Sequence, residues 1–490
     1  MAQTILWYDL ETFGTNPAWD KVAQFAAVRT DDSFEPVEDP VVLYCKITPD
    51  YIPDPKACLV TGITPQETLE KGMSEYEFIR AIDREFSRPG TTVTGFNSIR
   101  FDDEFIRNLY YRNFMDPYLR EWADGNSRWD IIDLVRVTRD LRPEGIEWPV
   151  SEETGRPTIR LEKLTEANKI GHRNAHDALS DVYATIEVAK MIQKKQPRLF
   201  KWVFDKRSKN ALRPLIELDR MTPLLHTSGM LTSERGCTTI MAPLTVDSSN
   251  RNCLYFYDLR VDPQPLIDLP VEEIRRRIFT RREELGDTPR IPLKGIHINK
   301  CPVLAPLSTL TAEAEERLGL DRVQCELHRH KLLEHREILQ KVRQVFAREE
   351  DDPAAPPVKE DPDMQIYSGG FFRDDDKACF ELVHNTLPEN LWKLQPPFRD
   401  PRLPEMLRRF VGRNFPETLP EDRAKQWRSY SAGRLLFPPV KNSSDFGEFR
   451  KRLENFRLSE ELDARDKVII KALSDYADSL EREILSYRES

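Results

Sequence analysis

The feature that most limits how this chain can fold is an acidic, proline-rich stretch at residues 349–363. It opens with Glu349-Glu350-Asp351-Asp352-Pro353 and holds further prolines before Asp363. Such a composition favours a solvated, semi-extended linker over a packed element. We therefore expect a domain boundary here.

The rest of the chain divides by its pattern of apolar residues. At 490 residues it is too long for one ordinary core, and a prior of roughly 100–200 residues per domain predicts about three domains. Residues 1–196 mix apolar strands, near 5–9 and 22–28, with helical segments, which predicts an α/β domain. Residues 197–348 carry short strand-like runs and predict a β-rich domain with helical insertions. Residues 364–490 show helical periodicity and predict an all-helical domain.

Composition sets the class of protein. Hydrophobic residues make up 39% and charged residues 32% of the chain, and no apolar run approaches the roughly 20 residues of a membrane helix. We therefore expect no membrane association. The first residues contain no basic segment of the kind that opens a signal peptide, so we expect a cytoplasmic location. The seven cysteines are scattered and include no Cys-x-x-Cys pair, so neither a disulfide framework nor a zinc site is predicted.

Net charge bears on the kind of partner. The formal charge of -10, taken alone, argues against nucleic acid, because phosphate contacts need clustered lysine and arginine. The distribution of charge matters more than its sum. Carboxylates gathered in a metal site and in a linker can coexist with a basic groove, so a nucleic-acid partner stays open.

Acidic residues follow two of the apolar strands. Asp9 and Glu11 stand two apart at the end of the first strand, so both side chains point to the same face. Asp102 follows a second apolar strand at the start of a predicted helix, where either Asp102 or Asp103 could simply cap the helix. Each motif alone is weak evidence for a functional site.

A histidine enters with the third motif, where His176 precedes Asp181 by five positions near the start of another helix. Together the three motifs offer a cluster of hard oxygen ligands, which suits Mg²⁺ or Mn²⁺. Two such ions about 4 Å apart can activate water and stabilise the leaving oxygen in phosphodiester hydrolysis. An imidazole that titrates near neutral pH can accept the proton of the attacking water. The combination predicts metal-dependent hydrolysis of a phosphodiester.

The order of these motifs, Asp-x-Glu, then Asn-x-x-x-Phe-Asp, then His-x-x-x-x-Asp, resembles the histidine branch of the DEDD exonuclease superfamily. The similarity is closer still to the bacterial exonuclease I family and extends over nearly the whole chain. The strings that carry it are Asp9-Leu10-Glu11-Thr12-Phe13-Gly14, Thr61-Gly62-Ile63-Thr64-Pro65, Arg100-Phe101-Asp102-Asp103-Glu104, Asn126-Ser127-Arg128-Trp129-Asp130, Leu141-Arg142-Pro143-Glu144-Gly145, Asn174-Ala175-His176-Asp177-Ala178, His297-Ile298-Asn299-Lys300-Cys301-Pro302-Val303-Leu304 and Arg413-Asn414-Phe415-Pro416.

The resemblance implies a fold and a set of site residues. The fold is an α/β ribonuclease-H-like exonuclease domain, followed by a β-rich SH3-like domain and an all-helical C-terminal domain. The cofactor is two Mg²⁺ ions, for which Mn²⁺ can substitute. The implied metal ligands are the carboxylates Asp9, Glu11, Asp102 and Asp181, Glu11 also meeting the substrate, and the implied general base is His176.

The resemblance also implies an activity and partners. The activity is processive 3′-to-5′ hydrolysis of single-stranded DNA to nucleoside 5′-monophosphates, in DNA repair and recombination. The partners are single-stranded DNA and the acidic C-terminal tail of single-stranded-DNA-binding protein, and we expect a monomer. Motif spacing leaves Asp103 as the helix cap, and it excludes His172, which lacks the five-residue spacing to an aspartate.

Aromatic and arginine residues alternate between residues 105 and 122. Bases of an unpaired strand stack on rings at roughly 1–3 kcal/mol each, and guanidinium groups meet phosphates. The helical spacing of several of these residues also fits an ordinary core face. We interpret Leu109 and Phe114 as core, and Arg107, Tyr118 and Trp122 as groove.

Three more arginines, Arg136, Arg142 and Arg160, occupy positions that line the DNA channel by the resemblance. Arg160 precedes a predicted helix that leads toward His176, so it can reach a phosphate near the metals. Two alternatives stay open at this point. One is an exoribonuclease, which only contacts to the 2′-hydroxyl would distinguish. The other is a non-catalytic binding module that keeps the fold.

Overall fold

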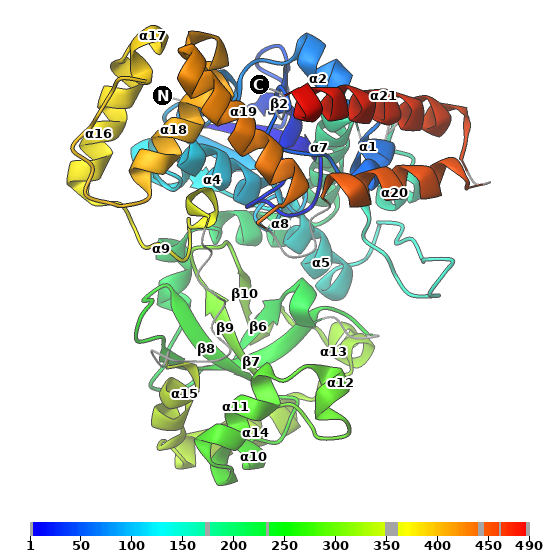
Figure 1. Ribbon diagram of the computed structural model, residues 1–490. Coiled ribbons are helices and arrows are strands. Elements are labelled where there is room, and N and C mark those ends of the chain that lie inside the picture. The colour runs from blue at the N-terminus through cyan, green and yellow to red at the C-terminus, as the bar shows by residue number, and fades with distance from the viewer. Residues whose placement is uncertain are drawn as a thin grey trace. The chain divides into compact units, whose positions relative to one another are not determined.

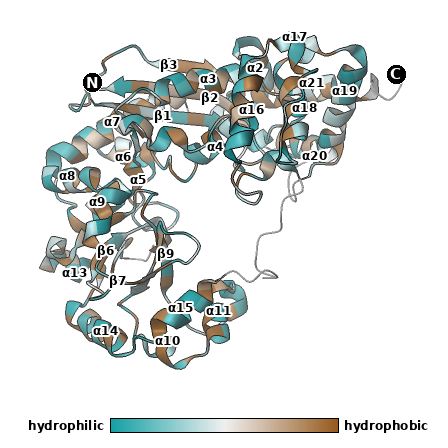
Figure 2. Cartoon of the chain, turned by 90° about the vertical axis from the view of Figure 1, so that its left-hand side faces the viewer, coloured by the Kyte–Doolittle hydropathy of each residue, from teal (hydrophilic) through white to brown (hydrophobic). Residues whose placement is uncertain are grey.

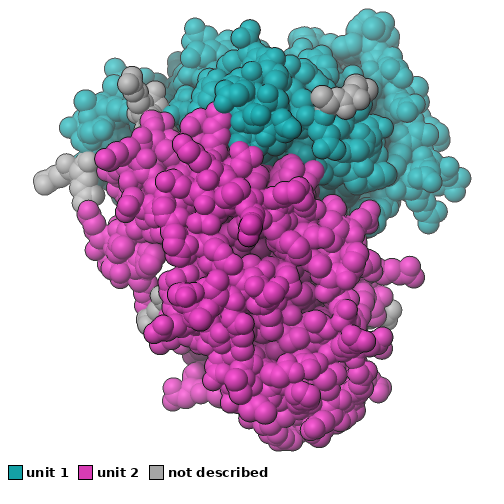
Figure 3. Space-filling view, turned by 180° about the vertical axis from the view of Figure 1, so that it is seen from behind, with its two compact units in different colours: residues 1–127, 172–183, 357–490 teal, residues 128–171, 184–356 magenta. Residues whose placement is uncertain are grey.

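The computed structural model describes residues 3–171, 177–231, 235–347, 361–439, 445–459 and 462–486. Contacts divide the chain into two compact units (Figure 3). The first holds residues 1–127, 172–183 and 357–490, and the second holds residues 128–171 and 184–356. Among the described helices, none is both long and apolar enough to cross a membrane.

The first unit is built on a sheet with strand order β3-β2-β1-β4-β5. Strand β1 pairs antiparallel with β2 and parallel with β4, so the chain crosses over between them through helices (Figure 1). The strands expected near 5–9 and 22–28 are thereby confirmed. The strands are β1 (Thr4–Thr12), β2 (Val22–Thr30), β3 (Val41–Tyr44), β4 (Thr91–Thr94) and β5 (Ser127–Arg128), the last lying where the two units meet in sequence.

Helices of the N-terminal segment cover this sheet because their apolar faces pack against it in a shared buried cluster. Phe78, Ile82 and Phe105 belong to the same buried cluster as Leu6 and Phe25 of the sheet. A capping box between Ser74 and Glu77 fixes the start of α3. The helices are α1 (Pro55–Thr61), α2 (Pro65–Lys71), α3 (Glu75–Phe86) and α4 (Asp102–Arg112), followed by the short turns η1 (Leu119–Glu121) and η2 (Ala123–Gly125).

The segment after the linker is helical, as predicted, and Figure 2 shows both hydrophobic and hydrophilic stretches along its helices. Its core is shared with the N-terminal segment. Phe13 and Tyr51 lie in one cluster with Phe449 and Leu473. A second cluster joins Tyr111 and Phe114 to residues of α16 and α18. The elements are η6 (Pro362–Met364), α16 (Asp374–Asn385), α17 (Pro388–Leu391), α18 (Leu403–Asn414), η7 (Pro416–Thr418), α19 (Glu421–Leu436), α20 (Phe446–Arg457) and α21 (Ala464–Ser486).

Buried ion pairs correct the expected end of the linker. The composition predicts a solvated segment as far as Asp363, but Asp361 and Asp363 are 9% and 2% exposed. Arg409 donates to Asp361 at 2.6 Å, and Arg413 donates to Asp363 at 2.5 Å. The acidic residues at the end of the stretch are therefore packed, because arginines some 50 positions later in the chain neutralise them. Residues 349–360 of the linker lie outside the described ranges.

The second unit contains an antiparallel sheet with strand order β10-β6-β7-β8-β9, which confirms the β-rich prediction for the middle of the chain. Its core includes Leu224, Met241, Phe256 and Ile296. The strands are β6 (Leu224–Thr227), β7 (Thr238–Val246), β8 (Cys253–Asp258), β9 (Leu293–His297) and β10 (Val303–Pro306).

Residues 128–171 and 184–195, assigned by sequence to the first domain, group by contacts with this second unit. The Asp140 carboxylate explains part of that grouping, because it accepts the Cys237 N–H and the Thr238 hydroxyl, each at 2.7 Å. The helices and short turns of the unit are α5 (Ile131–Leu141), α6 (Leu161–Ala167), most of α7 (Ala178–Lys195), α8 (Pro197–Asp205), α9 (Lys209–Leu212), η3 (Arg213–Leu215), η4 (Gly229–Leu231), α10 (Gln264–Asp268), α11 (Val271–Phe279), α12 (Arg282–Leu285), η5 (Leu307–Thr309), α13 (Ala312–Leu318), α14 (Arg322–Glu334) and α15 (Ile338–Phe346).

Candidate active site

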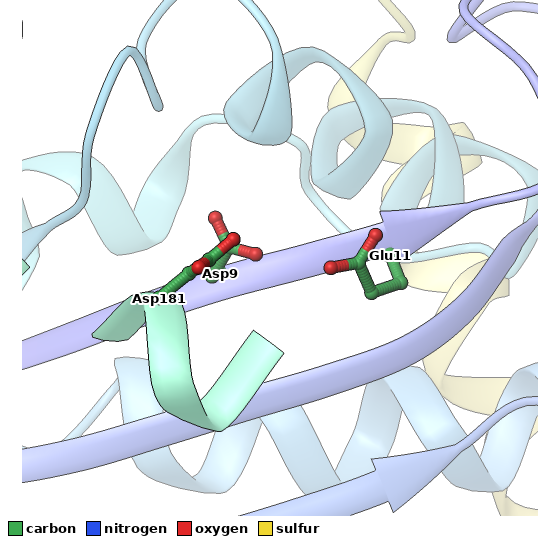
Figure 4. Close-up of side chains that lie close together, drawn as sticks. All are labelled: Asp9, Glu11 and Asp181. Carbon is green, nitrogen blue, oxygen red and sulfur yellow. The ribbon is translucent and has the colours of Figure 1, made fainter. Parts of the chain in front are cut away.

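Three predicted carboxylates meet at the end of strand β1. Asp9 and Glu11 extend from the strand, and Asp181 extends from the first turn of α7 toward them (Figure 4). One carboxylate oxygen from each residue lies within 4.8 Å of the others. The two strand residues share a face because side chains alternate along a strand. Asp-x-Glu spacing and a helix that begins at Ala178 thus bring together acids 170 positions apart.

The fourth predicted carboxylate, Asp102, joins them from the first residue of α4. Its Oδ1 accepts the backbone N–H of Leu10 at 3.2 Å, between the two acids of the strand. The same cavity, of ≈ 540 Å³, is lined by Asp9, Glu11, Asp102 and Asp181. All four sequence-predicted metal ligands therefore lie in one pocket of the first unit.

Crowding of like charge dominates the electrostatics of this pocket. Burial, followed by the charges of Asp181 and Asp102, raises the pKa of Glu11 from 4.5 to about 9. Burial and the neighbouring carboxylates also raise the pKa of Asp9 well above its usual range. Carboxylates this close cannot all ionise without a counter-charge. Hard oxygen donors in such a cluster fit divalent cations of the Mg²⁺ or Mn²⁺ type.

Asp103 does not cap α4, contrary to the expectation. The helix begins at Asp102, and its cap position is Phe101, whose side chain makes no capping bond. Asp103 instead accepts the Tyr8 hydroxyl at 2.7 Å and the Arg120 guanidinium at 2.6 Å, with both charged groups almost fully buried. The sequence indicates that Asp103 stands near the start of a helix. It does not indicate that a buried arginine, 17 residues later in the chain, binds its carboxylate.

The predicted base, His176, lies outside the described residues, as does His172. Asp177, which follows directly, is exposed, and its Oδ1 accepts the Ser180 N–H at 3.1 Å. This bond stabilises the first turn of α7, the turn that carries Asp181. The role of His176 stays a prediction.

The predicted groove residues of the first unit differ in exposure. Trp122 is 67% exposed, whereas Arg107 is 4% exposed and is paired with Glu104 and Glu121. The Arg107 guanidinium lies 5.2 Å from the ring centroid of the half-buried Tyr118. Arg107 therefore supports the Tyr118 ring from within the protein. The core interpretation of Leu109 and Phe114 is confirmed, since they are 0% and 1% exposed.

The three further arginines lie in the second unit. Arg136 is paired with Asp133 at 2.6 Å, and Arg142 donates to the carbonyls of Leu141 and Thr309. Arg160 is exposed immediately before α6. Their contacts with DNA stay predictions.

Two pocket residues, Lys56 and Val60 of α1, were not identified from the sequence. They line the cavity together with Thr12, Thr15 and Asn97, which lie in or beside the motifs. The family string Thr61-Gly62-Ile63-Thr64-Pro65 begins at the last residue of this helix, and it is the sequence signal that points to the region. Asn97 has φ 65, in the left-handed region that asparagine tolerates better than most residues. This explains in part why the second motif opens with asparagine.

Comparisons with known proteins agree with this geometry. The family model described as "Exonuclease" matches residues 6–189. The exonuclease I SH3-like domain model matches residues 207–348, and the exonuclease I C-terminal domain model matches residues 360–480. Together the three models span most of the chain.

Individual relatives match over nearly their full length. Exodeoxyribonuclease I of Escherichia coli K12 is 44% identical over 478 residues, which cover 97% of this chain and 98% of that protein. Exodeoxyribonuclease I of Haemophilus influenzae is 44% identical over 430 residues, which cover 87% of this chain and 90% of that protein.

Solved structures of such enzymes share the fold. Exonuclease I from Methylocaldum szegediense superimposes with a TM-score of 0.92 at 45% identity, covering 98% of this chain and 100% of that one. Escherichia coli exonuclease I in complex with a dA16 oligonucleotide gives a TM-score of 0.92 at 43% identity, with the same coverage. The carboxylate cluster, the three family models and these relatives lead to one conclusion: the chain belongs to the exonuclease I family.

Proposed function

We propose that this protein is an exodeoxyribonuclease that digests single-stranded DNA processively from its 3′ end and releases nucleoside 5′-monophosphates, in DNA repair and recombination. The observation that carries the proposal is the gathering of Asp9, Glu11, Asp102 and Asp181 in one pocket. Family membership supports the substrate, since exonuclease I of Escherichia coli has been solved with bound oligonucleotides.

The four carboxylates would hold two divalent ions, for which we propose Mg²⁺, with Mn²⁺ as a substitute. A zinc-bound form of the Escherichia coli enzyme with single-stranded DNA supports metal binding in the family. When bound, such ions would lower the pKa of the attacking water and stabilise the negative charge on the leaving oxygen. Glu11 also meets the substrate, and His176 accepts the proton of the attacking water at its ring nitrogen.

A group of aromatic rings in the first unit, two of them exposed, supports a path for single strands. The Tyr118 and Phe371 rings meet edge to face with centroids 5.8 Å apart, and Phe371 is 83% exposed. With the exposed Trp122, these rings offer stacking surface for unpaired bases. We propose that Arg136, Arg142 and Arg160 contact phosphates of single-stranded DNA, and that Arg107 acts by holding the Tyr118 ring.

The remaining proposals concern the domain bounds, the oligomeric state, the location and a protein partner. We propose three domains, at residues 1–196, 197–348 and 364–490, in a monomeric protein of the cytoplasm. We further propose that a basic surface docks the acidic C-terminal tail of single-stranded-DNA-binding protein.

Digestion of end-blocked oligonucleotides tests the proposal. A single strand with a blocked 3′ end should survive, whereas one with a blocked 5′ end should be digested to mononucleotides in Mg²⁺ and spared in EDTA. Matched RNA strands should be degraded more slowly than DNA. Digestion of the 3′-blocked strand, or undiminished activity of Asp181→Asn, would contradict the proposal.

A further inference from the structure

Lys56 stands apart among the residues that line the carboxylate pocket. Five of the described residues that line the pocket are acidic. Of the described lining residues, Lys56 is the one with a basic side chain. It is exposed on α1, and no ion pair of its ammonium group occurs among the described residues. An exposed lysine is usually only solvated, so its position in this pocket needs an argument of its own.

The acid nearest to it in sequence is already neutralised. Asp54 accepts the backbone N–H of Lys56 at 2.8 Å, and its Oδ1 also accepts the Arg452 guanidinium at 2.7 Å. Asp54 therefore has its own cation, and the Lys56 ammonium stays available at the pocket wall. The neighbouring lining residues Ala57 and Val60 carry no charge to compete for it.

Charge balance shows what this ammonium can bind. Four carboxylates and two divalent cations sum to zero, so a loaded metal cluster does not compensate the charge of the incoming strand. Each backbone phosphate brings one further negative charge. Of the described side chains that line the pocket, Lys56 is the one that offers a positive charge to it.

We propose that Lys56 is a substrate-binding residue that holds a backbone phosphate of the single strand beside the bond being cut. The inference rests on the proposed function, because it takes single-stranded DNA as the substrate. A lysine ammonium is a compact point charge with three donors, so it reads the phosphate and not the base. It contacts the strand equally before and during the reaction, so its loss raises KM and leaves kcat nearly unchanged.

Binding of a fluorescent oligothymidylate, followed by anisotropy in Ca²⁺ over a range of salt concentrations, tests this role. Lys56→Ala should raise the Kd about three- to tenfold at low salt and reduce the slope of log Kd against log salt by about 0.7, the value for one phosphate contact on a single strand. Lys56→Arg should retain the wild-type slope. Steady-state digestion in Mg²⁺ should show the rise in KM without a matching fall in kcat.

The matched control is Lys71→Ala, which removes an exposed lysine that is paired with Glu67 outside the pocket. Its Kd and salt slope should equal those of the wild type. If Lys56→Ala gives the same Kd and slope as Lys71→Ala while the wild type binds DNA, the inference on Lys56 is wrong. If the wild-type protein binds no single strand, the proposed function fails instead.

Discussion

Arg413 of α18 donates to the Asp50 carboxylate at 2.9 Å, a contact between residues 363 positions apart. Both side chains are almost fully buried, and the same guanidinium binds Asp363. The helices after the linker are thus tied to the N-terminal segment by charge as well as by shared apolar cores. Arg413 is the first residue of one of the strings that resemble the exonuclease I family. Its contact with Asp50 explains structurally why an arginine stands at that position.

Arg413→Met should destabilise the protein strongly. The substitution keeps most of the apolar stem but leaves Asp50 and Asp363 buried without this cation, and breaking a buried pair costs roughly 3–5 kcal/mol. Urea unfolding measures the loss. Arg408→Ala removes an exposed arginine of the same helix that pairs with Glu405, and should cost less than about 1 kcal/mol. Equal losses in the two variants would show that the buried pairs do not tie the segments together.

Stability should fall as the pH is lowered below 4.5, in part because of Glu75. Burial alone would raise its pKa, but the charges of Arg112, Lys21 and Arg413 lower it from 4.5 to about 2. A carboxyl with a lowered pKa stabilises the fold when ionised, so its contribution is complete above pH 4.5 and is lost as the pH falls toward 2. Glu75→Gln should flatten this part of a plot of unfolding free energy against pH. An unchanged slope in the variant would assign the acid sensitivity to other groups.

Two neighbouring carboxylates should respond in opposite ways to the same substitution. Asp102→Asn removes a charge from the metal pocket, so kcat should fall at least about 100-fold while stability holds, since an amide oxygen can still accept the Leu10 N–H. Asp103→Asn leaves Arg120 buried without its anion, so stability should fall by roughly 3–5 kcal/mol. Its folded fraction should keep most of its activity. Activity assays and urea unfolding on both variants separate the roles, and a reversed pattern would refute the assignment of ligand and structural acid.

Crowding in the metal pocket predicts a trade between stability and function. In the metal-free protein the pKa of Glu11 is raised from 4.5 to about 9, so at neutral pH Glu11 must take up a proton on folding, which costs free energy. Glu11→Gln is neutral in both states and removes this cost, so the metal-free variant should be more stable than the metal-free wild type. Added Mg²⁺ should raise the Tm of the wild type and have little effect on the variant, which should also lose activity. Thermal unfolding in EDTA and in Mg²⁺ provides the measurement. A Glu11→Gln protein with lower stability in EDTA would show that the cluster is not strained by its charge.

The sequence could predict those parts of the site that depend on local periodicity. Asp9 and Glu11 follow from the two-residue repeat of a strand, and Asp102 follows from a strand that ends before a helix. The partners of buried groups could not be predicted in this way. The bond from Arg120 to Asp103 depends on how the turn after α4 folds back.

The same limit applies to the fold. Alternation and helical spacing identify the α/β, β-rich and helical regions, because these patterns are local. Phe13 and Leu473 share one buried cluster although most of the chain separates them, and Asp361 pairs with Arg409, 48 positions later. Neither relationship follows from a local pattern. Lys56 was missed for a related reason. A lone lysine on a short helix carries no pattern, and only the pocket around it gives it meaning.

The exposed ring of Phe371 should contribute to single-strand binding without contributing to stability. Phe371 is 83% exposed, so its removal opens no cavity, but it loses a stacking surface beside Tyr118. A base stacked on a ring is worth about 1–3 kcal/mol, so Phe371→Ala should weaken oligothymidylate binding about 5- to 160-fold with an unchanged Tm. Phe437→Ala removes a ring that is 80% exposed elsewhere on the first unit and should leave binding intact. If both variants bind like the wild type, the strand does not pass over Tyr118 and Phe371. If both weaken equally, exposed apolar area in general, and not this pair of rings, holds the bases.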